Sequence, residues 1–426
     1  MTAEAHAKSY YAATANRHSD YPSLSEDSSC DVCVIGGGYS GLSSALHLAE
    51  RGYDVILLEA NRIAWGASGR NGGQVGSGQR QEQDVLEDML GIADARHLWD
   101  LAEESKTVVK TRIARHKIDC DLKPGILHAA SKPADAADFE PYVEKLAREY
   151  GYAHLRSVSR EEIGAMLGTN RYHGGILDSD SAHLHPLNYA LGLAGAADDA
   201  GARLFEASRV TGYQDGAVCR IACNGHQVIA HHVVLACNGY LERLEPRLAG
   251  KIMPINNFIL ATEPLGEALA GELIRDDVAV ADTKFVIDYY RLSADRRLLF
   301  GGGENYRRSF PPDIAGFVRK YMLRVYPQLE SKRIDYSWGG TLAITLNRMP
   351  DFGRLSSNIY FVQGFSGHGV AMASLAGKLI AEAVAGTAER FDVFARIPTR
   401  RFPGGTLLRW PGLVLGMLYY ALRDKL

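Results

Sequence analysis

The chain has 426 residues, of which 46% are hydrophobic and 23% charged, and its formal net charge is −3. This length predicts two domains rather than one simple core, and the charge argues against a nucleic-acid-binding surface, which would need a basic patch. Six cysteines at irregular spacing do not indicate a disulfide framework, so the composition favours a reducing compartment and a cytoplasmic protein.

The two ends of the chain carry no targeting signal that we recognise. Residues 1–27 are polar with scattered tyrosines, lack an apolar signal-peptide region, and are expected to lie as an arm on the surface. No stretch reaches the roughly 20 apolar residues that span a bilayer. The apolar stretch 413–422 is short, and we expect a helix packed on the body, with contact to a membrane surface as the alternative.

The pattern of a strand, a glycine turn, a helix and a second strand is found in CDVCVIGGGYSGLSSALHLAERGYDVILLEA. Its first apolar run is typical of a strand buried on both faces. Gly36 permits a tight turn, Gly38 lets backbone amides approach a pyrophosphate, and Gly41 lets the helix pack closely on the strand. The N-terminus of the helix can bind an anion, and Glu59 can accept hydrogen bonds from ribose hydroxyls. The stretch therefore predicts a dinucleotide-binding site.

A glycine-rich loop, NRIAWGASGRNGGQVGSG, follows the second strand directly. Its glycines allow the backbone to lie flat along a ligand. A disordered linker is the alternative, but Ile63, Trp65 and Val75 are apolar and the loop begins beside the predicted ribose-binding acid. We therefore expect this loop, Arg70 and Asn71 included, to contact the cofactor.

The middle of the chain alternates between helical and strand patterns. Helical spacing of apolar residues over 82–117 and 133–150 predicts helices in a second domain inserted into the first. A helix predicted over 186–200 begins with proline and returns the chain to the nucleotide. The segment RLFEASRVTGY is predicted to be one strand whose far end, 208–210, meets the adenine end of the dinucleotide. The buried strand 233–236 ends on the same face.

Residues 251–262 and 285–303 are rich in strand formers and aromatic residues, which predicts a second, mainly antiparallel sheet. The hairpin DYYRLSADRRLLFGGG alternates well. Alternation places Tyr290 on one face and Tyr289 with Arg291 on the other. One of these faces is expected to line the ligand cavity.

A second glycine turn, GFSGHG, stands between a strand predicted at 359–363 and a helix from about Val370. An NAD enzyme has no need of a second such turn. FAD is longer, and its ring carries negative charge when reduced, which the N-terminus of a helix stabilises. The two turns with the glycine loop between them therefore favour FAD over NAD.

Several motifs spread from residue 9 to residue 405 resemble those of the D-amino-acid-oxidase-like family of FAD-dependent amine oxidoreductases. They are SYYAATAN, GASGRNGGQ, HLHP, DYYRLSADRRLLFGGG, GFSGHGV and RFPGG. The resemblance implies an α/β fold, α+β overall, with a Rossmann-like FAD-binding domain of the glutathione-reductase type and a substrate domain whose sheet covers the flavin. The long hairpin motif resembles the branch that acts on γ-glutamylated putrescine.

The resemblance also implies what this chain lacks. Related sarcosine oxidases tether the flavin through a cysteine in the segment that matches 341–345, where this chain has TLAIT, so we expect non-covalent FAD. Those relatives hold a substrate carboxylate with a lysine just after the GHG turn, where Val370 and Ala371 stand here. They activate oxygen with a lysine on the second hairpin, and RLLFGGGENY has none. The absence of a lysine after the GHG turn favours an amine whose carboxylate, if present, is remote, over an N-methyl α-amino acid.

The residues predicted to contact FAD come from the two turns, the glycine loop and the strand ends. They are Gly36, Gly38, Tyr39, Ser40, Gly41, Glu59, Ala60, Ala67, Ser68, Arg70, Asn71, Gly72, Gly73, Gln74, Val210, Ala236, Asn238, Gly340, Gly364, Phe365, Ser366, Gly367, His368, Gly369 and Val370.

The residues predicted to act on the substrate are fewer. His368 in the second turn is a candidate for flavin or substrate contact, with a helix-capping role as the alternative. The catalytic candidates are His368, Tyr290 and Arg291, and the substrate-binding candidates are Tyr289, Tyr290, Arg291, Phe258 and Trp338. For each of these, core packing or a surface ion pair is the competing interpretation.

No metal site is predicted. His183 and His185 lie close in sequence, but no third ligand is near. Cys30 and Cys33 form a CxxC pattern, but residues three apart on a strand are expected to face opposite sides. Cys219 and Cys223 are expected to be packing residues.

The predicted domains are discontinuous. Residues 28–80, 180–245 and 335–386 are assigned to FAD binding, 81–179 and 246–334 to the substrate domain, and 387–426 to a tail packed on the body.

The predicted reaction is oxidation of an amine C–N bond by hydride transfer to flavin N5. The imine is hydrolysed to aldehyde and ammonia, and O2 is reduced to hydrogen peroxide. The substrate that the resemblance implies is γ-glutamylputrescine or a related γ-glutamylated amine. The alternatives are an amine or D-amino-acid dehydrogenase that uses a quinone or carrier, and a non-catalytic nucleotide-binding regulator.

Overall fold

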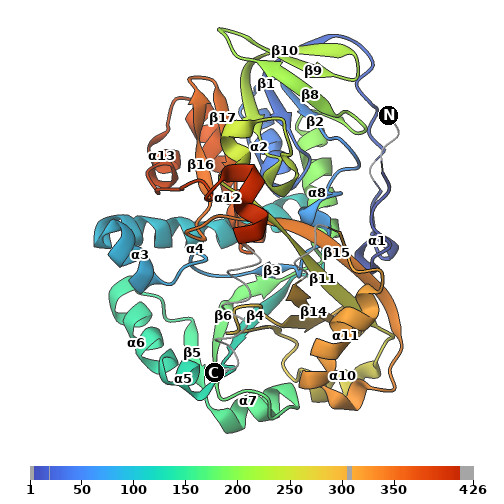
Figure 1. The fold of residues 1–426 in the computed structure, drawn as a ribbon, viewed down its shortest axis with the longest axis vertical. Coiled ribbons are helices and arrows are strands. Elements are labelled where there is room, and N and C mark those ends of the chain that lie inside the picture. The colour runs from blue at the N-terminus through green and yellow to red at the C-terminus, as the bar shows by residue number, and fades with distance from the viewer. Residues whose placement is uncertain (1–3, 19, 305–308, 413–426) are drawn as a thin grey trace.

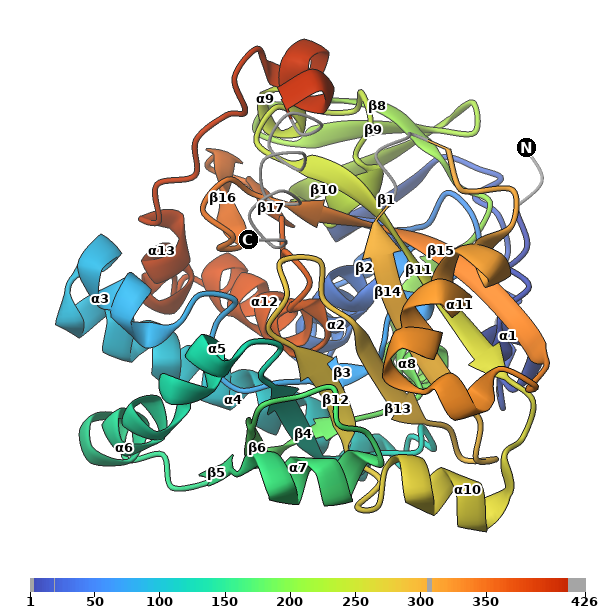
Figure 2. The same cartoon turned by 60° about the horizontal axis from the view of Figure 1, so that its bottom comes forward.

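The computed structural model describes residues 4–18, 20–304 and 309–412, and within them the strands form two sheets surrounded by helices (Figure 1, Figure 2). The first sheet has the order β16-β17-β10-β1-β2-β7, parallel except for β16 at one edge. An antiparallel β8–β9 hairpin pairs with β10. The strands are β1 Ser28–Ile35, β2 Val55–Leu58, β7 Arg203–Phe205, β8 Val210–Gln214, β9 Cys219–Cys223, β10 His226–Leu235, β16 Asp351–Ser356 and β17 Ile359–Gln363.

Strand β1 lies at the centre of this sheet because both of its faces are apolar. Val32 and Val34 belong to the core that the sheet shares with α2 (Tyr39–Ala49), α8 (Pro186–Asp199) and α12 (Gly369–Val384). Cys33 and Ile35 belong to the core on the opposite face, which β9 also enters. The predicted nucleotide-binding strand, helix and second strand are thus confirmed as β1, α2 and β2.

The second sheet has the order β15-β11-β14-β13-β12-β4-β6-β3, with β5 paired to β6. All of its pairs are antiparallel except β12 with β4, which confirms the predicted mainly antiparallel sheet. The strands are β3 Gln74–Val75, β4 Lys123–Ala129, β5 Leu155–Val158, β6 Gly175–His183, β11 Met253–Thr262, β12 Ala279–Asp282, β13 Tyr289–Leu292, β14 Leu298–Glu304 and β15 Ile334–Ile344.

The remaining helices lie around the two sheets. Helix α11 packs on β11, β14 and β15, and α10 packs on α7, both at the outer side of the second sheet (Figure 2). These helices are α1 Tyr10–Ala13, α3 Gln83–Leu90, α4 Ile92–His116, α5 Pro133–Ala137, α6 Phe139–Tyr150, α7 Arg160–Leu167, α9 Pro246–Ala249, α10 Gly266–Leu273, α11 Ile314–Val325 and α13 Glu389–Ala395, with 3-10 turns η1 Ala67–Gly69, η2 Asn238–Tyr240 and η3 Pro327–Leu329. In the described part of the chain, no helix is long and apolar enough to cross a membrane.

Two predicted elements differ in the structure. The helix predicted over 82–117 is two helices, α3 and α4, because Gly91 between them has a φ of +83°. The strand predicted through RLFEASRVTGY is also interrupted between β7 and β8. There, Glu206 turns inward so that its Oε1 accepts a hydrogen bond from the backbone N–H of Ile63 at 2.7 Å, and Ala207 has a φ of +48°.

The predicted domain boundaries remain a prediction, and the strand pairing contradicts one of them. Residues 335–344 were assigned to the FAD-binding domain, but β15 pairs along its whole length with β11 of the second sheet. Strand β3 also pairs with the second sheet, through β6. The chain therefore crosses between the sheets after β15 rather than before it.

The two terminal segments lie against the body. In the arm, the side chains of Tyr10 and Tyr11 are buried, and Tyr11 meets the rings of His185 and Trp338 edge-on. After α13, Phe402 and Trp410 pack against Met253 and its neighbours. The apolar stretch 413–422 lies outside the described residues, so its predicted helix is not addressed.

Candidate active site

The first glycine turn, between β1 and α2, is fixed by close packing. A Cβ on Gly36 would lie 2.7 Å from the carbonyl oxygen of Ala236 at the end of β10, and the φ of Gly36 is +113°. A Cβ on Gly41 would lie 1.9 Å from the carbonyl oxygen of Gly36. The helix begins after Gly38, and the N–H of Tyr39 donates to Ser68 Oγ at 3.0 Å. These contacts hold the N-terminus of α2 at the edge of a cavity.

Glu59 follows β2 and holds two backbone amides beside that turn. Its Oε2 accepts from the N–H of Gly37 at 2.7 Å, and its Oε1 accepts from the N–H of Asn61 at 2.8 Å. Burial raises the pKa of this carboxyl, which the two amides oppose. Since each carboxylate oxygen can accept more than one hydrogen bond, Glu59 keeps acceptor capacity for a diol in the cavity.

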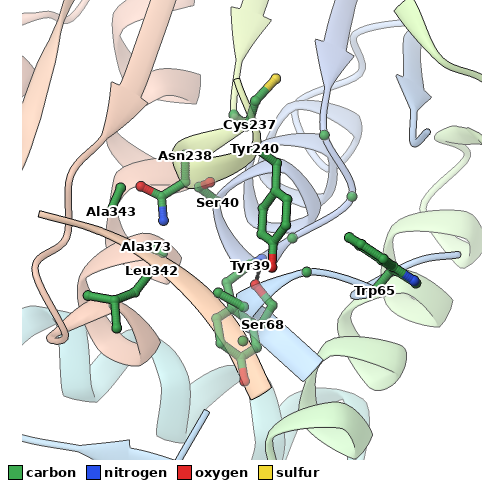
Figure 3. A pocket seen from close by; sticks show the side chains of 18 of the residues that line it. Tyr39, Ser40, Trp65, Ser68, Cys237, Asn238, Tyr240, Leu342, Ala343 and Ala373 are labelled. Carbon is green, nitrogen blue, oxygen red and sulfur yellow. Dashed lines mark hydrogen bonds between the residues drawn. The ribbon is translucent and has the colours of Figure 1, made fainter. Parts of the chain in front are cut away.

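The cavity has a volume of about 750 Å³ and extends from β8 and the segment after η2 to β13 and the second glycine turn. Figure 3 shows Tyr39, Ser68 and Tyr240 around one part of it. The predicted FAD contacts that line it are Gly36, Gly38, Tyr39, Ser40, Glu59, Ala60, Ala67, Ser68, Arg70, Asn71, Gly72, Gly73, Gln74, Val210, Ala236, Asn238, Gly340, Phe365, Ser366, Gly367, Gly369 and Val370.

The glycine loop forms one wall of the cavity and is ordered by its own side chains. The Asn71 amide donates to the carbonyl oxygens of Ala67 and Ser68, each at 3.0 Å. The Arg70 guanidinium lies over the Trp65 ring and donates to the carbonyl oxygen of Gly339 at 3.2 Å. The alternative of a disordered linker is therefore excluded for this loop.

The second glycine turn, between β17 and α12, brings another helix N-terminus to the cavity. The N–H of Gly364 donates to Asn238 Oδ1 at 2.9 Å, and that of Ser366 donates to the carbonyl oxygen of Ala343 at 3.0 Å. Gly364 itself does not line the cavity. Helices α2 and α12 pack directly on each other, and Ser43 Oγ donates to the carbonyl oxygen of Ser374 at 2.6 Å. The two turns thus have a fixed mutual orientation.

His368 precedes α12 but is absent from the cavity lining, although Gly367 and Gly369 on either side of it are present there. Its imidazole turns toward Gly76, where an added Cβ would lie 3.0 Å from His368 Cε1. Burial, helped by Arg80, lowers the pKa of His368 to about 4. The side chain makes no capping hydrogen bond to α12. The geometry therefore favours neither a contact between the His368 side chain and a ligand in the cavity nor the helix-capping alternative.

Only one of the substrate-binding candidates, Tyr289, lines the large cavity. Its hydroxyl donates to Asn257 Oδ1 of β11 at 2.5 Å, and Asn257 also lines the cavity. Burial raises the pKa of Tyr289, so its phenol stays protonated. Of the two hairpin faces left open by the sequence, the face of Tyr289 and Arg291 is the one turned to the cavity.

The other candidates lie behind that wall. The ring of Tyr290 stacks on Phe300 in the core of the second sheet, and Phe258 is buried in the same core. The Arg291 guanidinium is buried and donates to the carbonyl oxygens of Gly72 and Leu184. Trp338 Nε1 donates to the carbonyl oxygen of Arg70 at 3.0 Å. These contacts correct the expectation that the four side chains line the cavity, because each packs against protein instead. Gly41 likewise has a packing role.

The cavity also includes residues outside the list of predicted FAD contacts, although Ser208 and Arg209 lie in the segment 208–210 that was expected to meet the adenine end. Asn61, Trp65 and Gly66 likewise lie in the glycine loop that was expected to contact the cofactor. The residues outside that list mostly follow strand ends or stand in irregular segments, where no periodicity marks them. They are Glu4, Ile35, Gly37, Leu58, Asn61, Trp65, Gly66, Ser208, Arg209, Thr211, Cys237, Tyr240, Leu241, Glu242, Arg243, Leu244, Asn257, Ile287, Leu342, Ala343 and Ala373. For Gly37 and Gly66 the glycine-rich motifs were a usable signal.

Metal and redox roles find no support in the described residues, which contain no group of three His, Cys, Asp or Glu side chains able to hold a metal ion. His183 Nε2 donates to the carbonyl oxygen of Asp277, and His185 caps α8. Cys30 and Cys33 do not face opposite sides as expected, since both enter one buried cluster. Both are nonetheless free thiols, and burial raises the pKa of Cys30 to about 12.

The geometry fits FAD in particular. Two helix N-termini, whose first N–H groups have no acceptor within their own helix, face one cavity. Glu59 can accept from a ribose at one end, and the second turn stands at the other.

Comparison with known proteins agrees with this geometry. The FAD dependent oxidoreductase (DAO) family matches residues 31–383. Over 422 residues, the chain is 46% identical to gamma-glutamylputrescine oxidoreductase of Escherichia coli, covering 99% of each chain. It is 39% identical to the probable oxidoreductase OrdL of Haemophilus influenzae, covering 99% of this chain and 98% of the relative.

Solved structures share the fold. Glycine oxidase from Geobacillus kaustophilus superimposes with a TM-score of 0.74 at 21% identity, over 88% of this chain and all of its own. L-proline dehydrogenase from P. horikoshii superimposes with a TM-score of 0.70 at 21% identity, over 87% of this chain and 96% of its own. With its two glycine turns on one cavity and a family match from β1 to the end of α12, the chain belongs to the DAO family of FAD-dependent oxidoreductases.

Proposed function

We propose that this enzyme oxidises the terminal C–N bond of a γ-glutamylated amine, with γ-glutamylputrescine as the first candidate, and passes the electrons to O2. The observation that carries the proposal is the similarity, over 99% of both chains, to a gamma-glutamylputrescine oxidoreductase. The cavity supports it, because Asn257, Ile287, Tyr289 and Leu342, which line the end formed by β11, β13, β15 and the segment before β13, are uncharged. Such an end suits a neutral amine.

Bound FAD would supply a two-electron acceptor for a hydride, and the groups described above would hold it. The substrate loses a hydride from carbon and a proton from nitrogen, and water hydrolyses the resulting imine to aldehyde and ammonia. Because the Tyr289 hydroxyl donates its proton to Asn257, its oxygen lone pairs remain to accept an N–H from the substrate amine. The protein wall positions the amine and excludes water, so no acid–base triad is required.

We also propose that FAD is bound non-covalently. Segment 341–345 has no cysteine. The thiol that does line the cavity, Cys237, donates to the carbonyl oxygen of Ile35 at 3.4 Å, and burial raises its pKa to about 12, which disfavours a nucleophilic thiolate. Acid precipitation should release all of the flavin into the supernatant. A cytoplasmic location is proposed on the six free cysteines.

The test is anaerobic reduction of the purified yellow enzyme by γ-glutamylputrescine, putrescine, sarcosine and D-amino acids. We expect rapid bleaching with γ-glutamylputrescine and stoichiometric hydrogen peroxide when O2 is admitted. Bleaching only by sarcosine or a D-amino acid would overturn the substrate. Reoxidation by a dye but not by O2 would indicate a dehydrogenase, and a colourless protein that binds no FAD would indicate a regulator.

A further inference from the structure

The segment that follows α13 differs in charge from the rest of the chain. Residues 393–423 include five arginines and no aspartate or glutamate, whereas the whole chain has a formal net charge of −3. Within this segment, the stretch 413–422 is apolar and has no charged residue. A basic segment with apolar residues beside its arginines is typical of chains that lie on an anionic surface.

The first part of this segment is docked on the body of the protein. Residues 405–412 are helical, and Figure 2 shows this short helix in red beside α9, at the edge of the molecule. Arg409 donates to the carbonyl oxygen of Ala249 in α9 at 2.5 Å. Phe402 and Trp410 pack on the adjoining ends of β11 and β15. These three side chains therefore fix the helix on the protein.

The same helix exposes apolar side chains next to cations. Leu407 is 83% exposed, more than any other large hydrophobic side chain in the described part of the chain, and Leu408 is 60% exposed. Arg400 and Arg401 directly precede this helix and are also exposed. Leucine side chains lose free energy when they leave water, so two exposed leucines beside two exposed arginines favour a partner that is both apolar and anionic.

We propose that this segment, 393–412 with the apolar stretch that follows, binds the surface of a membrane that contains anionic lipids. Leu407 and Leu408 enter the boundary between headgroups and acyl chains, and Arg400 and Arg401 pair with lipid phosphates. The uncharged stretch 413–422 is about half of the roughly 20 residues needed to span a bilayer. Its length therefore suits binding at the surface and not crossing.

The membrane contact lies next to the cofactor cavity. Leu342 of β15 packs in the same cluster as Phe402 and Trp410, and it also lines the cavity. The proposal does not depend on the identity of the amine, because it rests only on the exposure and charge of the segment after α13.

Flotation of the full-length holoenzyme with lipid vesicles tests the proposal. The vesicles contain phosphatidylcholine alone or phosphatidylcholine mixed with the anionic lipid phosphatidylglycerol. The variants are the leucine pair Leu407→Ser with Leu408→Ser and the arginine pair Arg400→Gln with Arg401→Gln. The controls are Leu122→Ser, before β4, and Arg51→Gln, beyond the end of α2, because both residues are exposed.

We expect the wild type and both controls to float with the anionic vesicles and to be released by high salt. The partition coefficient should fall about 10- to 30-fold in the arginine pair and at least about tenfold in the leucine pair. Flavin content and thermal unfolding should be the same in all five proteins, which separates lost membrane binding from lost folding.

A wild type that does not float, or that binds both kinds of vesicle equally, overturns the proposal. Equal partition of wild type and both pair variants overturns it as well. A wild type that does not float but is a dimer by light scattering, with a monomeric leucine pair, would assign the surface to a second copy of the chain. None of these outcomes affects the proposed amine oxidation, which is measured without vesicles.

Discussion

The two glycine turns bring helix N-termini to the same cavity but are built differently. In the first, an added Cβ would lie 1.9 Å from backbone at Gly41 and 2.7 Å from backbone at Gly36. In the second, Gly367 has a φ of +93°, and an added Cβ would meet no atom within 4 Å. The first turn is therefore fixed by steric contact, whereas this position of the second is fixed by backbone conformation alone.

The difference shows that the same local motif can be held either by residues near it in the sequence or by distant segments of the tertiary structure. The partners of the first turn come mainly from the adjoining strand, helix and loop. Those of the second come from distant segments, since Asn238 and Ala343 accept its backbone N–H groups. The second turn is placed by the tertiary structure, and its helix α12 is aligned with α2 by direct packing.

The largest effect is expected for Gly41→Ala, because the new methyl group would collide with the Gly36 carbonyl. We expect loss of more than about 3 kcal/mol of stability and little bound FAD, measured as flavin per chain and by thermal unfolding. Gly52→Ala is the matched control, because Gly52 has a φ of +86° but no atom within 4 Å of an added Cβ. A Gly41→Ala protein with full flavin content would contradict the steric account.

The next largest effect is the pH dependence of folding stability that His47 causes at the interface of α2 and α12. His47 Nδ1 donates to the carbonyl oxygen of Ser43, and burial lowers the pKa of His47 to about 4. Its unfolded pKa is about 6.5, so the unfolded chain takes up a proton first as the pH falls. Stability is fully present above pH 6.5 and is lost toward pH 4, by about 3 kcal/mol in total.

Urea unfolding of wild type and His47→Gln between pH 7.5 and 5 measures this contribution. The variant should show a shallower loss of unfolding free energy, by about 1 kcal/mol per pH unit. His97→Gln, whose side chain is 63% exposed, should follow the wild type. Identical slopes in all three proteins would be inconsistent with a buried neutral His47.

Glu59→Ala tests the polar part of the first turn. Removal of the carboxylate leaves the N–H groups of Gly37 and Asn61 without their acceptor and removes the proposed acceptor for the ribose hydroxyls. We expect the dissociation constant of FAD to rise about 10- to 100-fold, measured by titration of the apoprotein. The control is Asp54→Asn. Asp54 directly precedes β2 and is exposed, so this variant should bind FAD like the wild type.

Tyr289→Phe and Tyr290→Phe form a matched pair on opposite faces of β13. Tyr289→Phe should keep its flavin but lose about tenfold in kcat/KM, because one hydrogen bond to the substrate amine is removed. Tyr290→Phe should keep its activity and lose only stability, because Tyr290 donates to Tyr172 in the core. Equal kinetic losses would mean that the cavity face has been assigned wrongly.

The smallest effect is expected for Gly367→Ala. The methyl group has space, so the cost is the left-handed backbone conformation alone, about 1 kcal/mol. FAD should remain bound, and the rate constant of flavin reduction should change by less than about fivefold. A loss of FAD as complete as in Gly41→Ala would remove the distinction between the two turns.

Much of the cofactor side could be predicted from the sequence because its signals are local. Gly36, Gly38 and Glu59 stand at fixed offsets along one strand, turn, helix and strand, and the glycine loop follows without interruption. Such spacing determines geometry over a few residues, and the cavity is lined where these motifs predicted it. The mainly antiparallel second sheet was also predictable, because alternation is local.

The substrate side could not be predicted in the same way. Alternation separated Tyr289 from Tyr290 but could not say which one faces the cavity, and it placed Arg291 correctly on the face of Tyr289 without revealing that backbone carbonyls bind it. His368 stands in a motif, yet its imidazole turns toward Gly76.

The sequence alone therefore predicted the cofactor and both glycine turns from short-range spacing, and the motifs that resemble a known family implied the fold class. Only the tertiary structure decided which hairpin face forms the cavity wall and how α12 aligns with α2. The physical reason is that side-chain burial and charge proximity depend on which distant segments pack together, and no local period records that choice.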